Sequence, residues 1–144
     1  MFEGLTEEEL ASIYKLCLNV SFTEGQTIIK EDQPGDKIFI LVEGQVEIIV
    51  DNPLNKGEKI RLAKLSTHET FGEFSLFDDA PRSATAIAQT NTRLMEIPCK
   101  DLLELFDENN RLGIKLMKNL GKILCARLRN IDIEYRNAQL WVGV

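Results

Sequence analysis

The chain has 144 residues, of which 44% are hydrophobic and 28% are charged, and its net charge is −6. This length suits one domain with its own core and is too short for two ordinary domains. No apolar run reaches the roughly 20 residues that a membrane span needs, so the composition indicates a soluble globular protein. Because DNA-binding surfaces are basic, the negative charge argues against direct nucleic-acid binding by this chain.

The N-terminus and the cysteines predict a cytoplasmic location. The acidic start lacks the basic region of a signal peptide. Cys17, Cys99 and Cys125 are odd in number, widely separated and without the spacing of metal ligands. We therefore expect reduced thiols that are buried or half-buried, as in a cytosolic protein.

The first predicted element is a helix over residues 5–18. Thr6 and Glu9 have the spacing of a capping box, in which each side chain accepts a hydrogen bond from the other residue's backbone N–H. Leu10, Ile13, Tyr14 and Cys17 then form one apolar face.

Residues 20–98 change to short runs with a period of two, separated by turns that contain glycine or proline. The predicted strands are Gln26–Lys30, Lys37–Glu43, Gln45–Asp51, Lys59–Lys64, Ser83–Gln89 and Thr92–Pro98. Many short strands at regular spacing favour an antiparallel roll or barrel.

The pattern becomes helical again from Lys100 onward. It predicts a short helix over Asp101–Phe106 and a long helix from Asn110 to about Tyr135, with a polar break over residues 107–110. No repeat or linker is visible. The sequence therefore predicts one domain over residues 1–144, with a β-roll at about 20–98 and C-terminal helices at about 100–136.

The most informative stretch covers residues 71–85. Gly72 lets the backbone pass close to a neighbour, Glu73 supplies a carboxylate, and Arg82 follows nine residues later beside Ser83. A carboxylate and a guanidinium on one loop suit a ligand that carries both hydroxyls and an anionic phosphate, which describes a cyclic nucleotide. The alternative is an internal ion pair between Glu73 and Arg82 that only stabilises the loop.

This stretch, together with three glycines upstream of it, resembles the cyclic nucleotide-binding domain family. The upstream matches are Gly25, Gly35 followed by Asp36, and Gly44. The family includes bacterial catabolite activators, regulatory subunits of kinases and nucleotide-gated channels, and the resemblance covers residues 5–135. It implies a mainly β fold, an antiparallel jelly-roll-like β-roll of eight strands with an N-terminal helix and C-terminal short and long helices. It also implies cAMP or cGMP as ligand, with no cofactor and no metal.

The phosphate is expected to bind at the second half of this loop. A planar guanidinium donates two parallel hydrogen bonds to phosphate oxygens, so we assign Arg82 to this role. Phe74 begins a short turn whose free backbone N–H groups favour an anion. The resemblance implies that the backbone N–H groups of Ser75 and Ser83 contribute, and the Ser83 hydroxyl is well placed to join them.

The sugar and base are expected to contact other residues. Glu73 would accept a hydrogen bond from the ribose 2′-OH, and Gly72 would let the backbone approach the sugar. The resemblance places Ile48, Leu62 and Ala63 along the ribose and base, although Ile48 and Leu62 are also expected to be core residues.

The long helix carries an apolar stripe formed by Leu120, Leu124, Leu128, Ile131 and Tyr135. This stripe can pack on the domain itself or form a homodimer with a second copy, and the pattern leaves both open. Lys115, Lys118, Lys122 and Arg127 are predicted to form a solvated face. Ile131 and Asp132 stand where the catabolite activators have a Thr-Ser pair that reads adenine. Asp132 is either a reader of guanine or, as we favour, an exposed carboxylate.

These features predict a stand-alone regulatory sensor rather than an enzyme. A metal oxygenase on a similar roll needs several inward histidines, and the chain has one histidine, His68, in a predicted loop. We expect ligand to move the long helix against the roll about the polar break, and the signal to reach an unknown effector protein or a second copy. Two alternatives stay open. The chain could be the ligand-binding part of a transcription regulator, or a degenerate interaction module that has lost its affinity.

Overall fold

The structure is a computed structural model and describes the backbone of residues 1–142, with side chains as far as residue 140. Eight antiparallel strands form two four-stranded sheets, ordered β1-β8-β3-β6 and β2-β7-β4-β5. The elements are α1 Glu7–Tyr14, β1 Leu18–Phe22, β2 Thr27–Ile29, β3 Lys37–Glu43, β4 Val46–Asp51, β5 Lys59–Leu65, β6 Thr70–Phe71, α2 Phe74–Phe77, β7 Thr85–Ala88, β8 Thr92–Pro98, α3 Cys99–Glu108 and α4 Asn110–Val142. The predicted fold class is confirmed.

The sequence pattern placed some strands correctly and missed others. The bounds of β3 and β8 are those predicted, and β2, β4, β5 and β7 differ by one or two residues at their ends. The pattern missed β6, which has only two residues, and β1, which follows directly on the first helix. β1 exists because all five of its residues pair with β8, a long-range contact that a local pattern does not reveal.

Two cores lie on opposite faces of the sheet that contains β3. Phe39 and Leu41 point into the space between the two sheets. Ile38 and Ile40 alternate to the other face, where they pack against residues of the helices. Because β3 is buried on both faces, it reads as a continuous apolar run rather than an alternating one.

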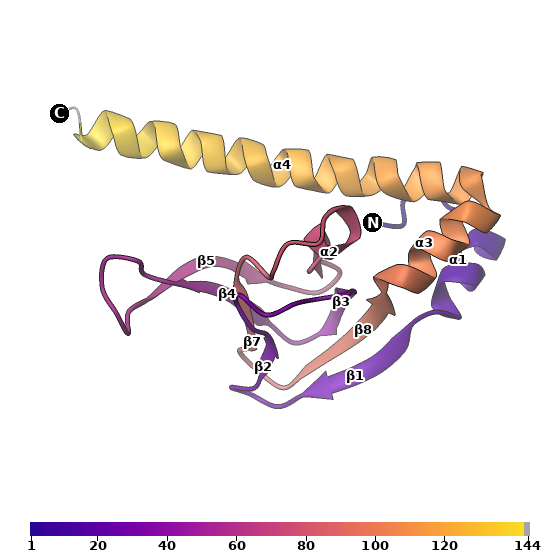
Figure 1. Ribbon diagram of the computed structural model, residues 1–144, viewed down its shortest axis with the longest axis horizontal. Coiled ribbons are helices and arrows are strands. Elements are labelled where there is room, and N and C mark those ends of the chain that lie inside the picture. Colours follow the sequence, from indigo (N-terminus) through magenta and orange to yellow (C-terminus); the bar gives the residue numbers. More distant parts are fainter. Residues whose placement is uncertain (143–144) are drawn as a thin grey trace.

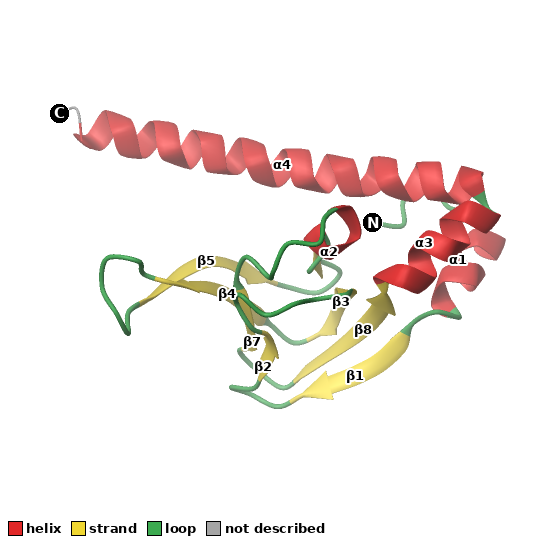
Figure 2. Cartoon of the chain, in the orientation of Figure 1, coloured by secondary structure: helices red, strands yellow, loops and turns green. Residues whose placement is uncertain are grey.

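The helices lie on one side of the roll. α1 and α3 lie at one end of the molecule, and α4 crosses above the roll along its whole length, with α2 beneath it (Figures 1 and 2). The capping box of α1 is confirmed, but the helix spans Glu7–Tyr14 and is shorter than the predicted 5–18. α4 is longer than predicted and reaches Val142. None of the described helices is long and apolar enough to cross a membrane.

Candidate functional site

Gly72 opens the candidate site at the end of β6. Its φ of +77° lies in the left-handed region that disfavours other residues. A Cβ at this position would lie 3.0 Å from Nη1 of Arg82 and 3.1 Å from the carbonyl oxygen of Lys37. Glycine is therefore required here for both its conformation and its size, and the loop passes directly over the arginine.

Arg82 is half-buried and connects three segments of the chain. Its Nη1 donates to the carbonyl oxygen of Gly72 at 2.9 Å and to the Ser75 hydroxyl at 2.8 Å. Its Nη2 donates to the carbonyl oxygen of Lys37 at 2.9 Å. Its backbone N–H donates to the carbonyl oxygen of Gln33 at 2.9 Å. Arg82 therefore joins the site loop to the start of β3 and the segment before it.

The charge of Arg82 has no carboxylate partner. Among the described residues no ion pair includes Arg82, so the alternative of an internal Glu73–Arg82 pair is wrong. Burial lowers the pKa of the guanidinium, while nearby Cys99, Asp36 and Glu73 act in the opposite direction. Arginine stays protonated at neutral pH nonetheless. A half-buried positive charge that only neutral oxygens contact is suited to receive an anion.

Gly35 makes room for this arginine. A Cβ on Gly35 would lie 1.8 Å from Nε and 2.2 Å from Cζ of Arg82, so no larger residue fits without displacing the guanidinium. The sequence identified Gly35 as a turn residue and as one of the glycines of the family resemblance, without a contact partner. Its contact with a side chain 47 positions later exists only in the folded chain.

Glu73 is 3% exposed and pairs with Arg127 of α4. Arg127 also donates to the carbonyl oxygen of Thr70 in β6. Lys115 is half-buried and pairs with Glu9 of α1. The prediction that Arg127 and Lys115 belong to a solvated face is therefore wrong, whereas Lys118 and Lys122 are exposed as predicted. One signal could have found Arg127. It lies seven residues after the fully buried Leu120, so the two share one face of the helix.

The other predicted phosphate residues lie in the same loop as Arg82. The Ser75 hydroxyl contacts Arg82, and its backbone N–H donates to the carbonyl oxygen of Gly72 at 3.4 Å. Phe74 begins α2 as predicted and is 53% exposed. Ser83 is exposed next to Arg82 in the chain. Of these residues Ser75 therefore contacts the Arg82 guanidinium, and Phe74 and Ser83 are exposed members of the same loop.

The residues predicted along the base lie on the neighbouring sheet. Ile48 and Ala63 face each other across β4 and β5 and pack against the core between the sheets. Leu62 is 58% exposed, so the expectation that it is a core residue is wrong. Of the predicted ligand residues, only Arg82 lines a separate hollow of about 400 Å³ next to the 30–37 segment.

The remaining reactive side chains do not form a metal site. Within residues 1–142 no group of three His, Cys, Asp or Glu residues could hold a metal ion. Cys17 is half-buried and Cys99 buried, as predicted, but Cys125 is exposed. Burial raises the pKa of the Cys17 and Cys99 thiols, which keeps both protonated at neutral pH. His68 is exposed in the loop before β6, as expected.

Comparison with known proteins places this architecture in a family. A model of the cyclic nucleotide-binding domain matches residues 19–109. A CRP-like cAMP-activated global transcriptional regulator from Mycobacterium tuberculosis is 28% identical over 132 residues, which cover 92% of this chain and 56% of the regulator. The chain thus spans little more than half the length of this curated relative.

Two solved structures are similar along almost all of the chain. A cyclic nucleotide-binding domain from Methylobacillus flagellatus has a TM-score of 0.83 and 26% identity, with 90% of this chain and 72% of that chain covered. The N-terminal domain of a transcriptional regulator from Streptomyces coelicolor has a TM-score of 0.77 and 28% identity, with 90% of each chain covered. The chain belongs to the cyclic nucleotide-binding domain family.

Proposed function

We propose that this chain binds a cyclic nucleotide, with cAMP as the preferred ligand and cGMP as the second candidate, and acts as a cytoplasmic regulatory sensor without catalysis of its own. The observation that carries the proposal is the half-buried guanidinium of Arg82, which has no carboxylate partner among the described residues and lies in the same loop as the buried Glu73. The loop would then bind the phosphate and the ribose, and the sugar and base would also lie against β4 and β5.

The phosphate would take over donors that Arg82 now gives to neutral oxygens. The bonds of Arg82 to neutral oxygens are charge-assisted on the donor side only, whereas a phosphate supplies an ionised acceptor that a guanidinium contacts through two parallel hydrogen bonds. A cyclic phosphate therefore competes well with the carbonyl oxygens of Gly72 and Lys37 and the Ser75 hydroxyl. The backbone N–H and hydroxyl of Ser83 complete this proposed anion site, together with the backbone N–H of Ser75, which would exchange its 3.4 Å hydrogen bond to the Gly72 carbonyl oxygen for the phosphate.

Glu73 retains an acceptor for the sugar. Arg127 contacts Oε1 of Glu73, while Oε2 makes no hydrogen bond among the described residues. We assign Oε2 to the ribose 2′-OH, with Gly72 against the sugar. Ile48, Leu62 and Ala63 then line the sugar and base, with the exposed Leu62 available for apolar contact.

The choice of base is argued from a relative and from two residues of α4. The name of the M. tuberculosis relative describes it as cAMP-activated, which favours cAMP for this chain. Ile131 and Asp132 replace the Thr-Ser pair of the catabolite activators, and both are exposed on α4. This chain would therefore recognise adenine without a Thr-Ser pair. It would use other side chains, or only apolar contact with Ile48, Leu62 and Ala63.

The signal would leave the site through α4. Because Arg127 joins Glu73 to α4, a ligand that bonds to Glu73 changes an interaction between the roll and the helix. A ligand shifts such an equilibrium only by its differential affinity for the two arrangements. The output is a change in how α4 lies on the roll, which an effector protein, a second copy or a further domain of a transcription regulator can detect.

A homodimer is the second part of this proposal. The apolar stripe of α4 divides in the structure. Leu120 is fully buried in the domain's own core, whereas Leu128, Ile131 and Tyr135 are 59%, 59% and 66% exposed. Their spacing of three and four residues is that of a two-helix seam. Packing on the domain therefore accounts for the first part of the stripe and leaves the second part for a second copy.

Calorimetric titration of the purified protein with cAMP, cGMP and a cyclic dinucleotide tests the function. We expect one site per chain with micromolar or tighter affinity for cAMP, weaker affinity for cGMP, and no heat from the dinucleotide. The absence of binding to all three would leave the degenerate interaction module as the function.

A further inference from the structure

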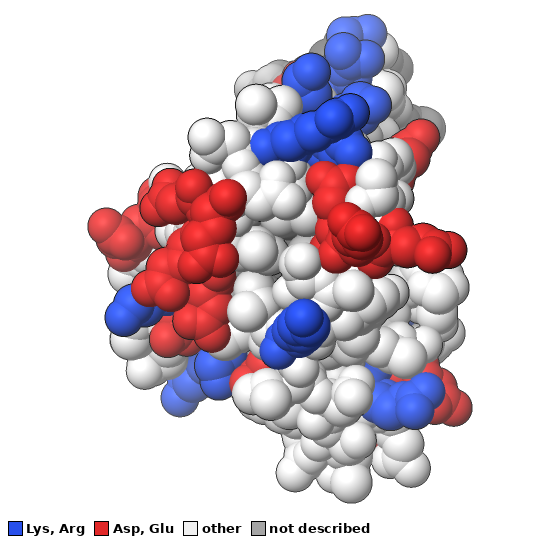
Figure 3. Space-filling view, turned by 90° about the vertical axis from the view of Figure 1, so that its right-hand side faces the viewer, with Lys and Arg blue, Asp and Glu red and all other residues white. Residues whose placement is uncertain are grey.

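Among the residues whose side chains the structure describes, three carboxylates are buried. They belong to Glu9, Glu73 and Glu96, which are 7%, 3% and 9% exposed. Other acidic side chains lie on the surface, and Figure 3 shows two groups of them on one face of the molecule. Because a buried charge is costly unless it is paired and hydrogen-bonded, the contacts of each buried carboxylate show what it does.

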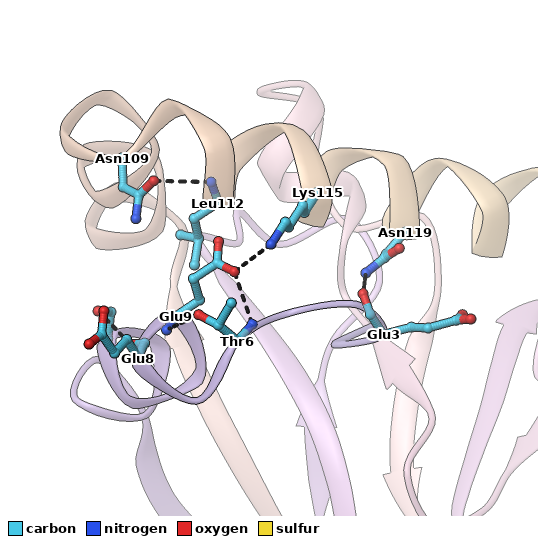
Figure 4. A network of polar contacts seen from close by, with 9 residues as sticks. Glu3, Thr6, Glu8, Glu9, Asn109, Leu112, Lys115 and Asn119 are labelled. Carbon is cyan, nitrogen blue, oxygen red and sulfur yellow. Dashed lines mark hydrogen bonds and ion pairs between the residues drawn. The ribbon is translucent and has the colours of Figure 1, made fainter.

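Two of the buried carboxylates fasten α4 to the rest of the domain. Glu9 lies 2.6 Å from the Lys115 ammonium and accepts a hydrogen bond from the backbone N–H of Thr6 at 2.9 Å (Figure 4). Glu73 pairs with Arg127. Both have a role in holding the helices, which leaves Glu96 to be explained.

Glu96 lies inside the roll and has a single polar partner among the described residues. Its Oε1 is 3.0 Å from the Lys37 ammonium, and its Oε2 makes no hydrogen bond within the described part of the chain. Glu96 is opposite Phe39 in the register of β8 and β3, and Phe39 belongs to the core between the sheets. Since opposite residues share one face of a sheet, the carboxylate points toward the space between the two sheets.

The Glu96–Lys37 pair lines the hollow of about 400 Å³ next to the 30–37 segment. This volume lies within the range of roughly 300–1,000 Å³ that is typical of small-ligand pockets. Phe22 and Ile28 line the same hollow and are only half-buried, so they have apolar surface left to cover. Lys37 is 42% exposed at the side chain, which leaves its ammonium accessible from solvent. The hollow thus combines an accessible ion pair with apolar walls.

The charges that line the hollow nearly balance. Three cations and two carboxylates contribute to it, namely Lys30, Lys37, Arg82, Asp36 and Glu96. A ligand with only positive or only negative groups would meet a like charge there. A ligand that carries one charge of each sign and an apolar body is complementary to both the ion pair and the walls.

We propose that this hollow binds a free α-amino acid with an apolar side chain. The ammonium group of the ligand donates to Oε2 of Glu96, and its carboxylate accepts from the Lys37 ammonium. These two ligand groups are attached to the same carbon, which suits protein charges that are 3.0 Å apart. The apolar side chain packs against Phe22 and Ile28. None of these four residues belongs to the proposed nucleotide site, so the two proposals stand independently.

NMR titration of isotope-labelled protein with L-phenylalanine and with L-leucine, up to millimolar concentration and without nucleotide, tests the site. At least one of the two amino acids should give saturable shifts of the backbone amide signals of residues 28–39 and of Glu96. The signals of residues 122–140 should not move. No saturable shifts with either amino acid, or shifts centred outside the hollow, would overturn the proposal.

Two analogues of the amino acid that binds test its two charges separately. Its amide lacks the carboxylate, and its N-acetyl derivative lacks the ammonium group. Each should bind about tenfold to a hundredfold more weakly, which corresponds to the loss of one charge-assisted hydrogen bond. An analogue that binds as tightly as the amino acid itself would contradict the assignment of that charge to Glu96 or Lys37.

Glu96→Gln should weaken amino acid binding by the same factor in a protein that still melts cooperatively. Glu43→Gln is the matched control, because Glu43 is an exposed carboxylate that pairs with Arg93 at the other end of β3. It should bind as wild type does, and equal affinity of the two variants would overturn the role of Glu96. If Glu96→Gln does not fold, the analogues decide the question in wild type. Calorimetry with cAMP is a separate measurement, so a failure of the proposed function leaves this result unchanged.

Discussion

The two ends of the candidate site are built in different ways. At the phosphate end, every hydrogen bond of the Arg82 guanidinium goes to groups of the roll and its loops. At the proposed sugar end, Glu73 pairs with Arg127 of α4, a helix to which Arg82 makes no hydrogen bond among the described residues. In the proposed site, the phosphate therefore binds to groups of the roll and its loops alone, whereas the sugar shares the Glu73 carboxylate with Arg127 of α4.

This difference separates affinity from signalling. Changes at the phosphate end should remove binding and leave the helix where it is. Changes at the sugar end should alter binding moderately and also change the attachment of α4. The following predictions test this separation, beginning with the largest expected effect.

Arg82→Ala should abolish binding of cAMP. Truncation of one partner of a buried charge pair costs roughly 2–5 kcal/mol, which is about thirtyfold to several thousandfold in affinity. The variant should still unfold cooperatively, with a Tm lowered because the acceptors that Arg82 satisfied lose their partner. Since ligand binds only the folded state, cAMP should raise the Tm of wild type and not that of the variant. Equal ligand-induced shifts in the two proteins would contradict the phosphate assignment.

Glu73→Gln should weaken binding of cAMP more than binding of its 2′-deoxy analogue. The wild-type carboxylate makes a charge-assisted hydrogen bond with the 2′-OH worth roughly 1.5–3 kcal/mol, and the deoxy ligand has no hydroxyl to lose. Calorimetric titration with both ligands measures the difference.

The matched control for this prediction is Arg127→Gln. It breaks the same ion pair with α4 but keeps the carboxylate, so it should change the affinities for both ligands by the same factor. Should Glu73→Gln also weaken both ligands equally, Glu73 would stabilise the loop and not read the ribose.

The smallest effect is expected from the pH dependence of stability, through the pair of Glu9 in α1 with Lys115 in α4. The hydrogen bonds of Glu9 with Lys115 and with the backbone of Thr6 hold the pKa of its carboxyl below the ordinary value of 4.5. A depressed pKa in the folded state means that this contribution to stability is present above the unfolded pKa and disappears as pH falls through the folded one. Wild type should therefore melt above Glu9→Gln at pH 6, and the difference in Tm should decrease below pH 4.5. A difference that stays constant with pH would mean that Glu9 contributes by packing only.

The site itself was accessible from the sequence because its chemistry is local. Gly72, Glu73, Ser75 and Arg82 lie within eleven positions of one another, so their spacing alone predicted one loop, and the structure brings them together. Which of them contact a nucleotide stays a prediction. The helical face shared with Leu120 could have shown that Arg127 faces the roll, but its pairing with Glu73, 54 positions earlier in the chain, was not accessible.

The sequence by itself determined the elements that depend on neighbours in the chain. The capping box of α1, the bounds of β3 and β8 and the short turn at Phe74 follow from local hydrogen bonding and from the period of apolar side chains. Only the tertiary structure decided the features that depend on where α4 crosses the roll. The path of α4 buries Leu120, leaves Leu128 exposed and brings Arg127 to Glu73. A helical period shows which residues share a face, but the crossing of helix and roll decides which part of that face is covered.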